Sequence, residues 1–147
     1  MKNLKLLEDL DLGNNKLKDT SVLNGLINLK KLSLKGNNIE NLNLNKFINL
    51  DDLNIENNKI SDISFLKNST KLANLNLKKN NIENIDNVSG LTKLTYLNLS
   101  DNLISNVEPL KSLTKLSSLY LSNNKISDIS SLKNLNELSS IKLDGNK

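Results

Sequence analysis

Several residue types that carry chemistry in proteins are missing from this chain. Histidine, cysteine, tryptophan, arginine and glutamine do not occur, and there is one proline. Without cysteine the chain cannot form a disulfide framework or a thiolate metal site. Without histidine it lacks the commonest general base and metal ligand. These absences argue against catalysis and metal binding, and we expect no cofactor and no metal.

Long apolar runs and one-sided charge are also missing. No stretch of 18 apolar residues occurs, so we expect no membrane span. The first nine residues include basic side chains but no uninterrupted apolar segment, so they do not predict a signal peptide. The net charge of +4 is spread along the chain without a polybasic arm. A length of 147 residues suits one domain.

What the chain does contain is a repeat. An asparagine returns about every 22 residues within the frame L-x-x-L-x-L-x-x-N-x-[IL], with isoleucine in place of some leucines. Such a period is typical of a solenoid, in which each unit buries its apolar face against its neighbours. These residues, called here the ladder asparagines, are Asn15, Asn37, Asn58, Asn80, Asn102, Asn124 and Asn146.

The apolar residues of each repeat follow two periods. Before the ladder asparagine they alternate, as Leu97 and Leu99 do, which predicts a short strand with one buried face. After it they recur at every third position, which fits an irregular or 3-10 arm. One such set is Ile104, Val107, Leu110, Leu113 and Leu116. We therefore predict a right-handed repeat solenoid, one domain over residues 1–147 with about six to seven repeats. Its curved parallel sheet would form the concave face and its arms the convex face.

The ladder asparagines have a structural role in this interpretation, which we favour over direct contact with a ligand. A side-chain amide both donates and accepts hydrogen bonds, so it can pair backbone groups that the bend after each strand leaves free. One repeat is a residue short, and we expect a local kink there with Phe47 filling core volume. A second turn is predicted ten residues after the asparagine, where positive φ can be required. That position is occupied by Gly25, Asn68, Gly90, Ser112 and Asn134.

The ends of the chain fall in mid-repeat. Met1 and Leu4 fit the end of a preceding unit, and Ile141 and Leu143 would lie on an uncovered terminal strand. Since solenoids usually cap their ends, we expect an uncapped fragment of a longer protein. We also expect that exposed ends favour end-to-end self-association.

These repeats resemble those of the leucine-rich repeat family, in its 22-residue class, over essentially the whole chain. Residues 126–135 (ISDISSLKNL) look like the repeat of bacterial internalins, surface proteins that grip host receptors, and residues 60–66 (ISDISFL) repeat the motif. The same class includes the regulatory subunit of protein phosphatase 1. The resemblance implies that partners dock on the concave strand side. It also implies that the missing cysteine caps favour a bacterial or an intracellular protein.

Three outward positions per strand form columns along the predicted concave face. In the N-terminal half their charges alternate in sign, with Asp11, Lys31, Asp52 and Glu56 among them. One interpretation is mutual neutralisation on a solvated face. The other is a charged partner site at these four residues, and both stay open.

Both tyrosines of the chain fall on this face, on neighbouring strands. Tyr96 and Tyr120 would be diagonal neighbours, with β-carbons roughly 7–8 Å apart. Their surroundings are small and polar, so we expect accessible rings, and Asn98→Ala should be nearly silent for stability. Tyrosine is enriched at interface hot spots, although two ordinary surface tyrosines are the alternative. The candidate partner-binding residues are therefore Tyr96, Tyr120, Asn98, Lys31, Asp52 and Glu56.

Catalysis and nucleic-acid binding are both disfavoured. A Ser–Lys pair at Ser33 with Lys31 or Lys35 would lie on an open surface, where nothing excludes water. The outward columns contain no arginine and no basic stripe, so we expect no nucleic-acid partner.

Together these features predict a protein-binding module, not an enzyme, that presents a concave sheet to a partner protein. We assign it to a bacterial surface or secreted protein. One alternative is an intracellular regulatory subunit that docks on an enzyme such as a phosphatase, which a native start at Met1 would favour. The other is an architectural spacer repeat without a specific partner. Location follows from the choice: secreted or cell-surface in the first case, cytoplasmic in the second.

Overall fold

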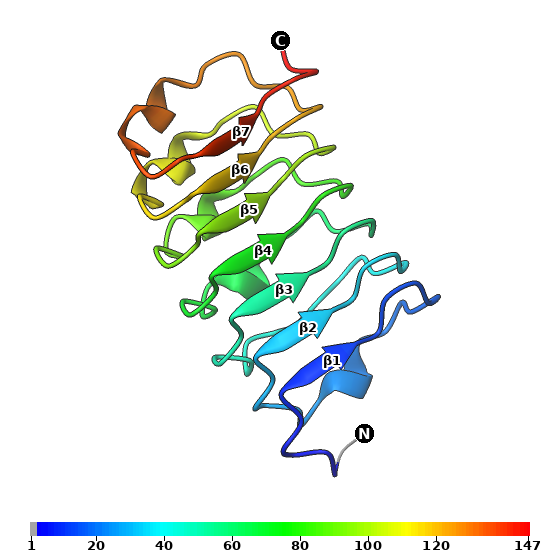
Figure 1. The fold of residues 1–147 in the computed structure, drawn as a ribbon. Coiled ribbons are helices and arrows are strands. Elements are labelled where there is room, and N and C mark those ends of the chain that lie inside the picture. The colour runs from blue at the N-terminus through cyan, green and yellow to red at the C-terminus, as the bar shows by residue number, and fades with distance from the viewer. Residues whose placement is uncertain (1–2) are drawn as a thin grey trace.

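The computed structural model describes residues 3–147, which coil into a stack with one short strand per turn (Figure 1). All seven strands pair in parallel and in chain order, in one open sheet. They are β1 (Asp9–Asp11), β2 (Lys31–Ser33), β3 (Asp52–Asn54), β4 (Asn74–Asn76), β5 (Tyr96–Asn98), β6 (Ser118–Tyr120) and β7 (Ser140–Lys142). The predicted repeat solenoid is confirmed. Met1, which we assigned to a preceding unit, lies outside the described residues.

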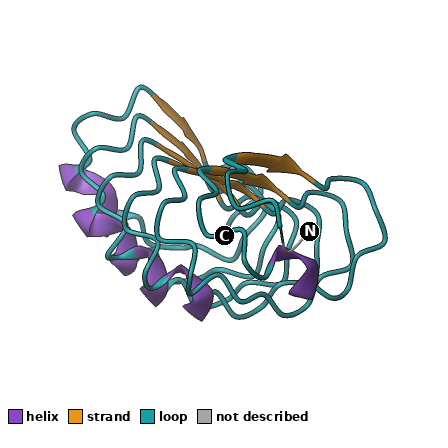
Figure 2. Ribbon diagram, turned by 90° about the horizontal axis from the view of Figure 1, so that it is seen from below, coloured by secondary structure: helices purple, strands orange, loops and turns teal. Residues whose placement is uncertain are grey.

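Most return arms contain a short 3-10 helix of three or five residues. These helices are η1 (Ser21–Leu23), η2 (Ser64–Leu66), η3 (Asp86–Val88), η4 (Glu108–Ser112) and η5 (Ser130–Asn134). Figure 2 shows them on the side of the coil away from the strands, which leaves the sheet to form the other face. The arm of the short repeat, between β2 and β3, has turns in place of a 3-10 helix. Phe47 is buried within that arm, with 4 % of its surface exposed.

The core is a narrow stack of leucine and isoleucine between the sheet and the arms. Leu97 and Leu99 of the β5 repeat are 0 % exposed, and the five apolar residues that follow at every third position are at most 2 % exposed. Ser69 interrupts the pattern, because it occupies one of these buried positions with a hydroxyl group. Among the described residues, Ser69 Oγ has no hydrogen-bond partner.

Positive φ recurs immediately before the ladder asparagines. The φ angles there lie between 54° and 72°, in the left-handed region that only glycine adopts without strain, although asparagine tolerates it. The residues concerned are Asn14, Gly36, Asn57, Lys79, Asp101, Asn123 and Gly145. This position makes the bend at the end of each strand, and we did not predict it.

The turn predicted ten residues after the ladder asparagine requires positive φ in one repeat only. Gly25 has φ of 98°, after Asn24 with φ −58° and ψ 122°. At the other four positions, Asn68, Gly90, Ser112 and Asn134, φ is not positive, although Asn68 and Gly90 do lie in turns. The reason is the 3-10 helix, which contains the last two residues and ends in a right-handed cap just before the first two.

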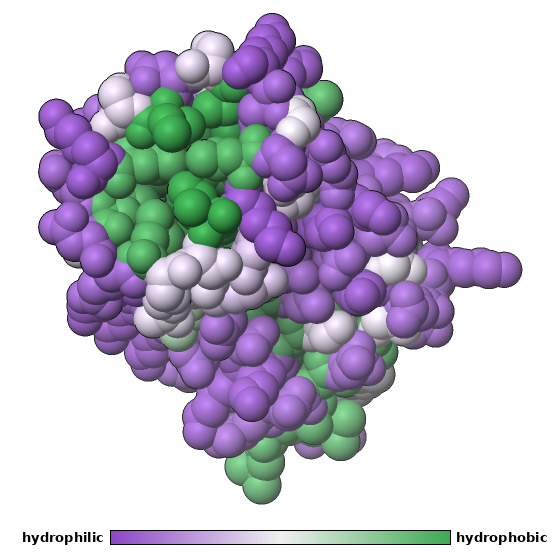
Figure 3. All heavy atoms as spheres, turned by 45° about the horizontal axis from the view of Figure 1, so that its top comes forward, coloured by the Kyte–Doolittle hydropathy of each residue, from purple (hydrophilic) through white to green (hydrophobic). Residues whose placement is uncertain are grey.

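Apolar surface is exposed at the C-terminal end of the stack. Ile141 on β7 is 44 % exposed, Ile129 is 47 % exposed, and Leu143 is partly buried. Figure 3, in which this end is turned forward, shows apolar atoms gathered there. End-to-end association through such surfaces stays a prediction.

Candidate functional site

The ladder asparagines lie at the bends that follow the strands and join successive turns of the coil. Asn80 Nδ2 donates to the carbonyls of Ile55 and Leu77, at 3.0 Å each, and to Lys78 at 3.3 Å. Its Oδ1 accepts the N–H of Ile60 at 3.0 Å. Asn37, Asn58, Asn102 and Asn124 repeat this pattern, and Asn146 follows it with two of the three donated bonds. The bonds of Asn15 stay within its own repeat. These amides bond to backbone groups, and those of Asn37, Asn80, Asn102 and Asn124 are buried.

The strand register aligns the outward residues into the columns named above. The first column, formed by the first residue of each strand, begins with Asp9, Lys31 and Asp52, which lie side by side. Lys31 takes part in none of the five ion pairs among the described residues. Partial burial raises the pKa of Asp52, while Lys31 lowers it and Asp51 and Asp9 add to the rise. Burial is the main cause of the raised pKa of Asp52, and the neighbouring charges act in both directions.

The other two charged candidates already have partners in the structure. The carboxylate of Glu56 lies 3.3 Å from Lys35 Nζ and accepts Asn76 Nδ2 at 3.2 Å. Asp11 accepts the N–H of Gly13 at 2.7 Å, and this bond, with one from the Ser33 hydroxyl, lowers the pKa of Asp11. The four charged candidates thus differ. Lys31 and Asp52 are in no ion pair among the described residues, whereas the carboxylate oxygens of Asp11 and Glu56 already accept hydrogen bonds or pair with a lysine.

The two tyrosines contact each other across β5 and β6. The ring centroids of Tyr96 and Tyr120 are 5.6 Å apart, with the planes tilted by 52°. Lys142 on β7 places its Nζ 5.7 Å from the Tyr120 ring centroid, within the range of a cation–π contact. Both rings are half-buried, less accessible than we expected, because they pack on each other and on the flanking side chains.

The amide of Asn98 also differs from our expectation. Its Oδ1 accepts the N–H of Ser100 at 3.0 Å, in a turn that Asn54 and Asn76 repeat on β3 and β4. Asn98→Ala should therefore weaken the bend after β5 and should not be silent. Only its Nδ2, which lies 3.5 Å from the Tyr96 hydroxyl, faces the tyrosine pair.

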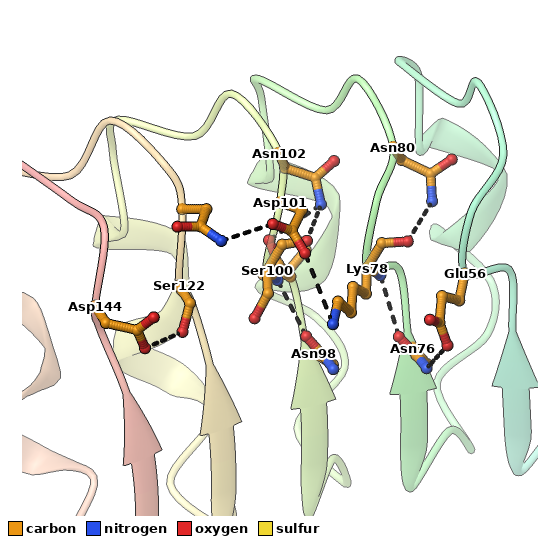
Figure 4. Close-up of polar contacts among 12 residues, drawn as sticks. Glu56, Asn76, Lys78, Asn80, Asn98, Ser100, Asp101, Asn102, Ser122 and Asp144 are labelled. Atoms are coloured by element: carbon orange, nitrogen blue, oxygen red, sulfur yellow. Dashed lines mark hydrogen bonds and ion pairs between the residues drawn. The ribbon is translucent and has the colours of Figure 1, made fainter.

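A polar trough of about 390 Å³ surrounds the tyrosine pair, and the ends of the strands form its wall. Asp101 lies 3.7 Å from Lys78 Nζ and accepts Asn123 Nδ2 at 2.7 Å (Figure 4). Ser122 donates to Asp144 at 2.6 Å, and this hydrogen bond is the main cause of the lowered pKa of Asp144. These contacts fix the positions of the side chains of Lys78, Asp101, Ser122, Asn123 and Asp144 beside the two aromatic rings.

Comparisons with known proteins agree with this geometry. Residues 70–112 match the family described as leucine-rich repeats in two copies, and residues 115–135 match the single leucine-rich repeat. Internalin C2 from Listeria monocytogenes superimposes with a TM-score of 0.94 at 37% identity, over 97% of this chain and 63% of that one. The chain is a leucine-rich repeat protein with internalin-like repeats.

Two further structures extend the comparison. A leucine-rich repeat protein from Leptospira interrogans superimposes with a TM-score of 0.92 at 32% identity, over 98% of this chain and 38% of its own. InlJ from Listeria monocytogenes, whose functional domain includes a cysteine ladder, does so with a TM-score of 0.89 at 26% identity, over 98% and 31%. This leucine-rich repeat chain thus spans about a third to just under two thirds of the length of these proteins. No curated protein sequence matches it.

The leucine-rich repeat fold brings together residues that the sequence analysis did not single out. Lys78, Asp101, Asn123, Lys142 and Asp144 line the trough with the tyrosines. Asp101 and Asn123 stand at the positive-φ position before a ladder asparagine, outside the three columns that we considered. Among residues 3–147 there is no acidic cluster suited to a metal ion. None of the helices in the same range is long and apolar enough to cross a membrane.

Proposed function

We propose that this leucine-rich repeat domain binds a partner protein through its concave sheet, with the tyrosine pair as the centre of the contact. Tyr96 and Tyr120 carry the largest outward side chains of the described strands, and they lie together. Tyrosine offers a large contact area with few rotatable bonds and a polar tip, which suits an interface centre. The tyrosine pair within the trough is the observation that carries this proposal.

The rigidity of the scaffold supports the same function. Each trough residue comes from a strand or from the bend after it, and each turn is bonded to the next through a ladder asparagine. A preordered surface loses little conformational entropy on binding, so moderate contacts suffice for affinity. Lys142 would contribute a charge at the edge of the tyrosine pair, beside Asp144.

We further propose that the domain is part of a bacterial surface or secreted protein. Its structural neighbours include internalins from Listeria monocytogenes and a protein from Leptospira interrogans, which supports a bacterial origin. Fractionation of the source cells, followed by detection with an antibody against the domain, tests this location. Recovery only in the cytoplasm would contradict it and would favour the intracellular regulatory subunit.

The binding site is tested by capture with a matched variant. The immobilised domain is exposed to cell lysates and secreted fractions, in parallel with the double variant Tyr96→Ala/Tyr120→Ala. A control double variant, Lys18→Ala/Lys133→Ala, removes two long exposed side chains away from the sheet. We expect a partner that the control retains and the tyrosine variant loses.

Two other outcomes would overturn the assignment. A partner retained by the tyrosine variant and lost by Lys31→Ala/Asp52→Ala would move the site to the charged N-terminal strands. Capture of no partner by any form, with concentration-dependent association of the domain itself, would favour the architectural alternative. Circular dichroism of every variant checks that the fold survives.

A further inference from the structure

A row of lysines follows the edge of the sheet where the strands begin, outside the three outward columns. Lys71, Lys93 and Lys115 stand three residues before β4, β5 and β6. Because successive repeats place equivalent residues about one strand spacing apart, the three stems lie in a line roughly 10 Å long. All three side chains are exposed.

The charges of this row are not neutralised by the protein. None of the three lysines takes part in an ion pair among residues 3–147, whereas five other lysines do. Lys71 donates to the neutral Asn49 Oδ1 at 2.7 Å. Like charges in register on neighbouring strands disfavour one another, so the row costs the fold some stability and offers it no internal partner.

An open groove of about 530 Å³ lies along the row. Ala73 and Thr95 line it, together with the three lysines. The Thr95 hydroxyl already donates to the Ala73 carbonyl at 3.2 Å, and the next repeats place Ser117 and Ser139 in the same kind of bond. The groove therefore offers methylene stems and ammonium groups, and few free hydroxyl donors.

The groove has defined limits. Asp51 lines its N-terminal part, beside Lys30, whose ammonium already pairs with Glu8 at 2.8 Å. In the repeat after Lys115 the equivalent position is Glu137. Acidic side chains thus stand at both ends of the three-lysine row, and a ligand with negative charge is confined between them.

We propose that this groove binds a short acidic peptide segment of a partner protein. Carboxylates on methylene stems complement ammonium groups and an apolar floor, whereas a sugar polymer would need the hydroxyl donors that the fold already uses. A nucleic acid is less suited, because no aromatic ring and no arginine line the groove. At about 3.3 Å per residue, the row matches roughly three to four extended residues.

Fluorescence anisotropy with labelled glutamate peptides of four and eight residues tests the proposal at low ionic strength. The variant Lys71→Gln/Lys93→Gln/Lys115→Gln removes the row. The control Lys16→Gln/Lys18→Gln/Lys125→Gln has the same net charge and removes exposed lysines that are in no ion pair among the described residues. With three surface ion pairs lost, we expect affinity to fall by about ten-fold or more in the first variant and less than about two-fold in the control.

Other results would refute the acidic-peptide groove. Equal losses in the two triple variants would mean that the peptide senses only net charge. A sulfated oligosaccharide that binds at least ten-fold more tightly than the glutamate peptides would reassign the groove to a polysaccharide. The Tyr96→Ala/Tyr120→Ala variant should bind the peptide unchanged, which keeps this test separate from that of the concave site.

Discussion

Substitution of Asn80 by alanine tests how the ladder stabilises the coil. Asn80 is 7 % exposed and joins two successive turns through four hydrogen bonds. The variant removes the side-chain amide and leaves the backbone chemistry intact. The other buried ladder asparagines stay in place, so the loss reports on this one amide.

The magnitude follows from which groups lose every partner. The carbonyl of Ile55 keeps Asn58 Nδ2, that of Leu77 keeps Asn102 Nδ2, and that of Lys78 keeps the N–H of Asn57. The N–H of Ile60 has only Asn80 Oδ1, so the variant leaves one buried donor unpaired. One such donor costs about 1–3 kcal/mol. For a chain of this size, this corresponds to a fall of roughly 2–12 °C in Tm.

Two companion variants make the reasoning refutable. Asn80→Asp keeps an acceptor for Ile60 but directs a buried negative charge at three carbonyls, so it should cost more than alanine does. Asn15→Ala removes an exposed amide that accepts no backbone N–H, and should cost less than about 0.5 kcal/mol. Thermal and urea unfolding followed by circular dichroism measures all three. Equal losses at Asn80 and Asn15, or an aspartate as stable as wild type, would contradict this account of the ladder.

Two further substitutions should stabilise the protein. Lys79 adopts φ of 54°, where other repeats have asparagine, glycine or aspartate, so Lys79→Asn should raise the free energy of unfolding by about 0.5–1 kcal/mol. No gain over the control Lys125→Asn would refute the strain. Ser69→Ala removes a buried hydroxyl that lacks a partner and should add about 1 kcal/mol by the same urea assay. A loss of stability there would mean that the hydroxyl is bonded in solution.

The fold could be predicted from the sequence because the same residue pattern recurs in every repeat and gives each repeat the same backbone path. The alternation at Leu97 and Leu99 and the three-residue spacing after Asn102 place the apolar side chains of these positions in the core. The bend before each ladder asparagine was missed, although asparagine, glycine and aspartate occupy that position in all repeats but one. Lys79 hides the signal, and the structure shows that tertiary context overrides its conformational preference.

Less of the candidate site could be predicted. The sequence predicted that Tyr96 and Tyr120 are neighbours, because the repeat itself determines the register of the strands. The hydrogen bonds of the outward side chains could not be predicted from the sequence, because they depend on where the backbone bends. Asn98 and Glu56 looked free on an outward face, yet the structure occupies their oxygens with a turn N–H and with Lys35 and Asn76. Asp101 lay outside the columns altogether.

An outward position on this solenoid is therefore not by itself a binding position. Successive repeats put equivalent side chains close enough to bond, as Asn123 with Asp101 and Ser122 with Asp144 do, so polar columns tend to satisfy themselves. The side chains that remain available to a partner are those that depart from the residue pattern of the repeat. Two large rings replace small polar residues on β5 and β6, and three lysines that are in no ion pair among the described residues follow the edge where the strands begin. Both features lie on the repeats from β4 onward, and we expect recognition to be concentrated there.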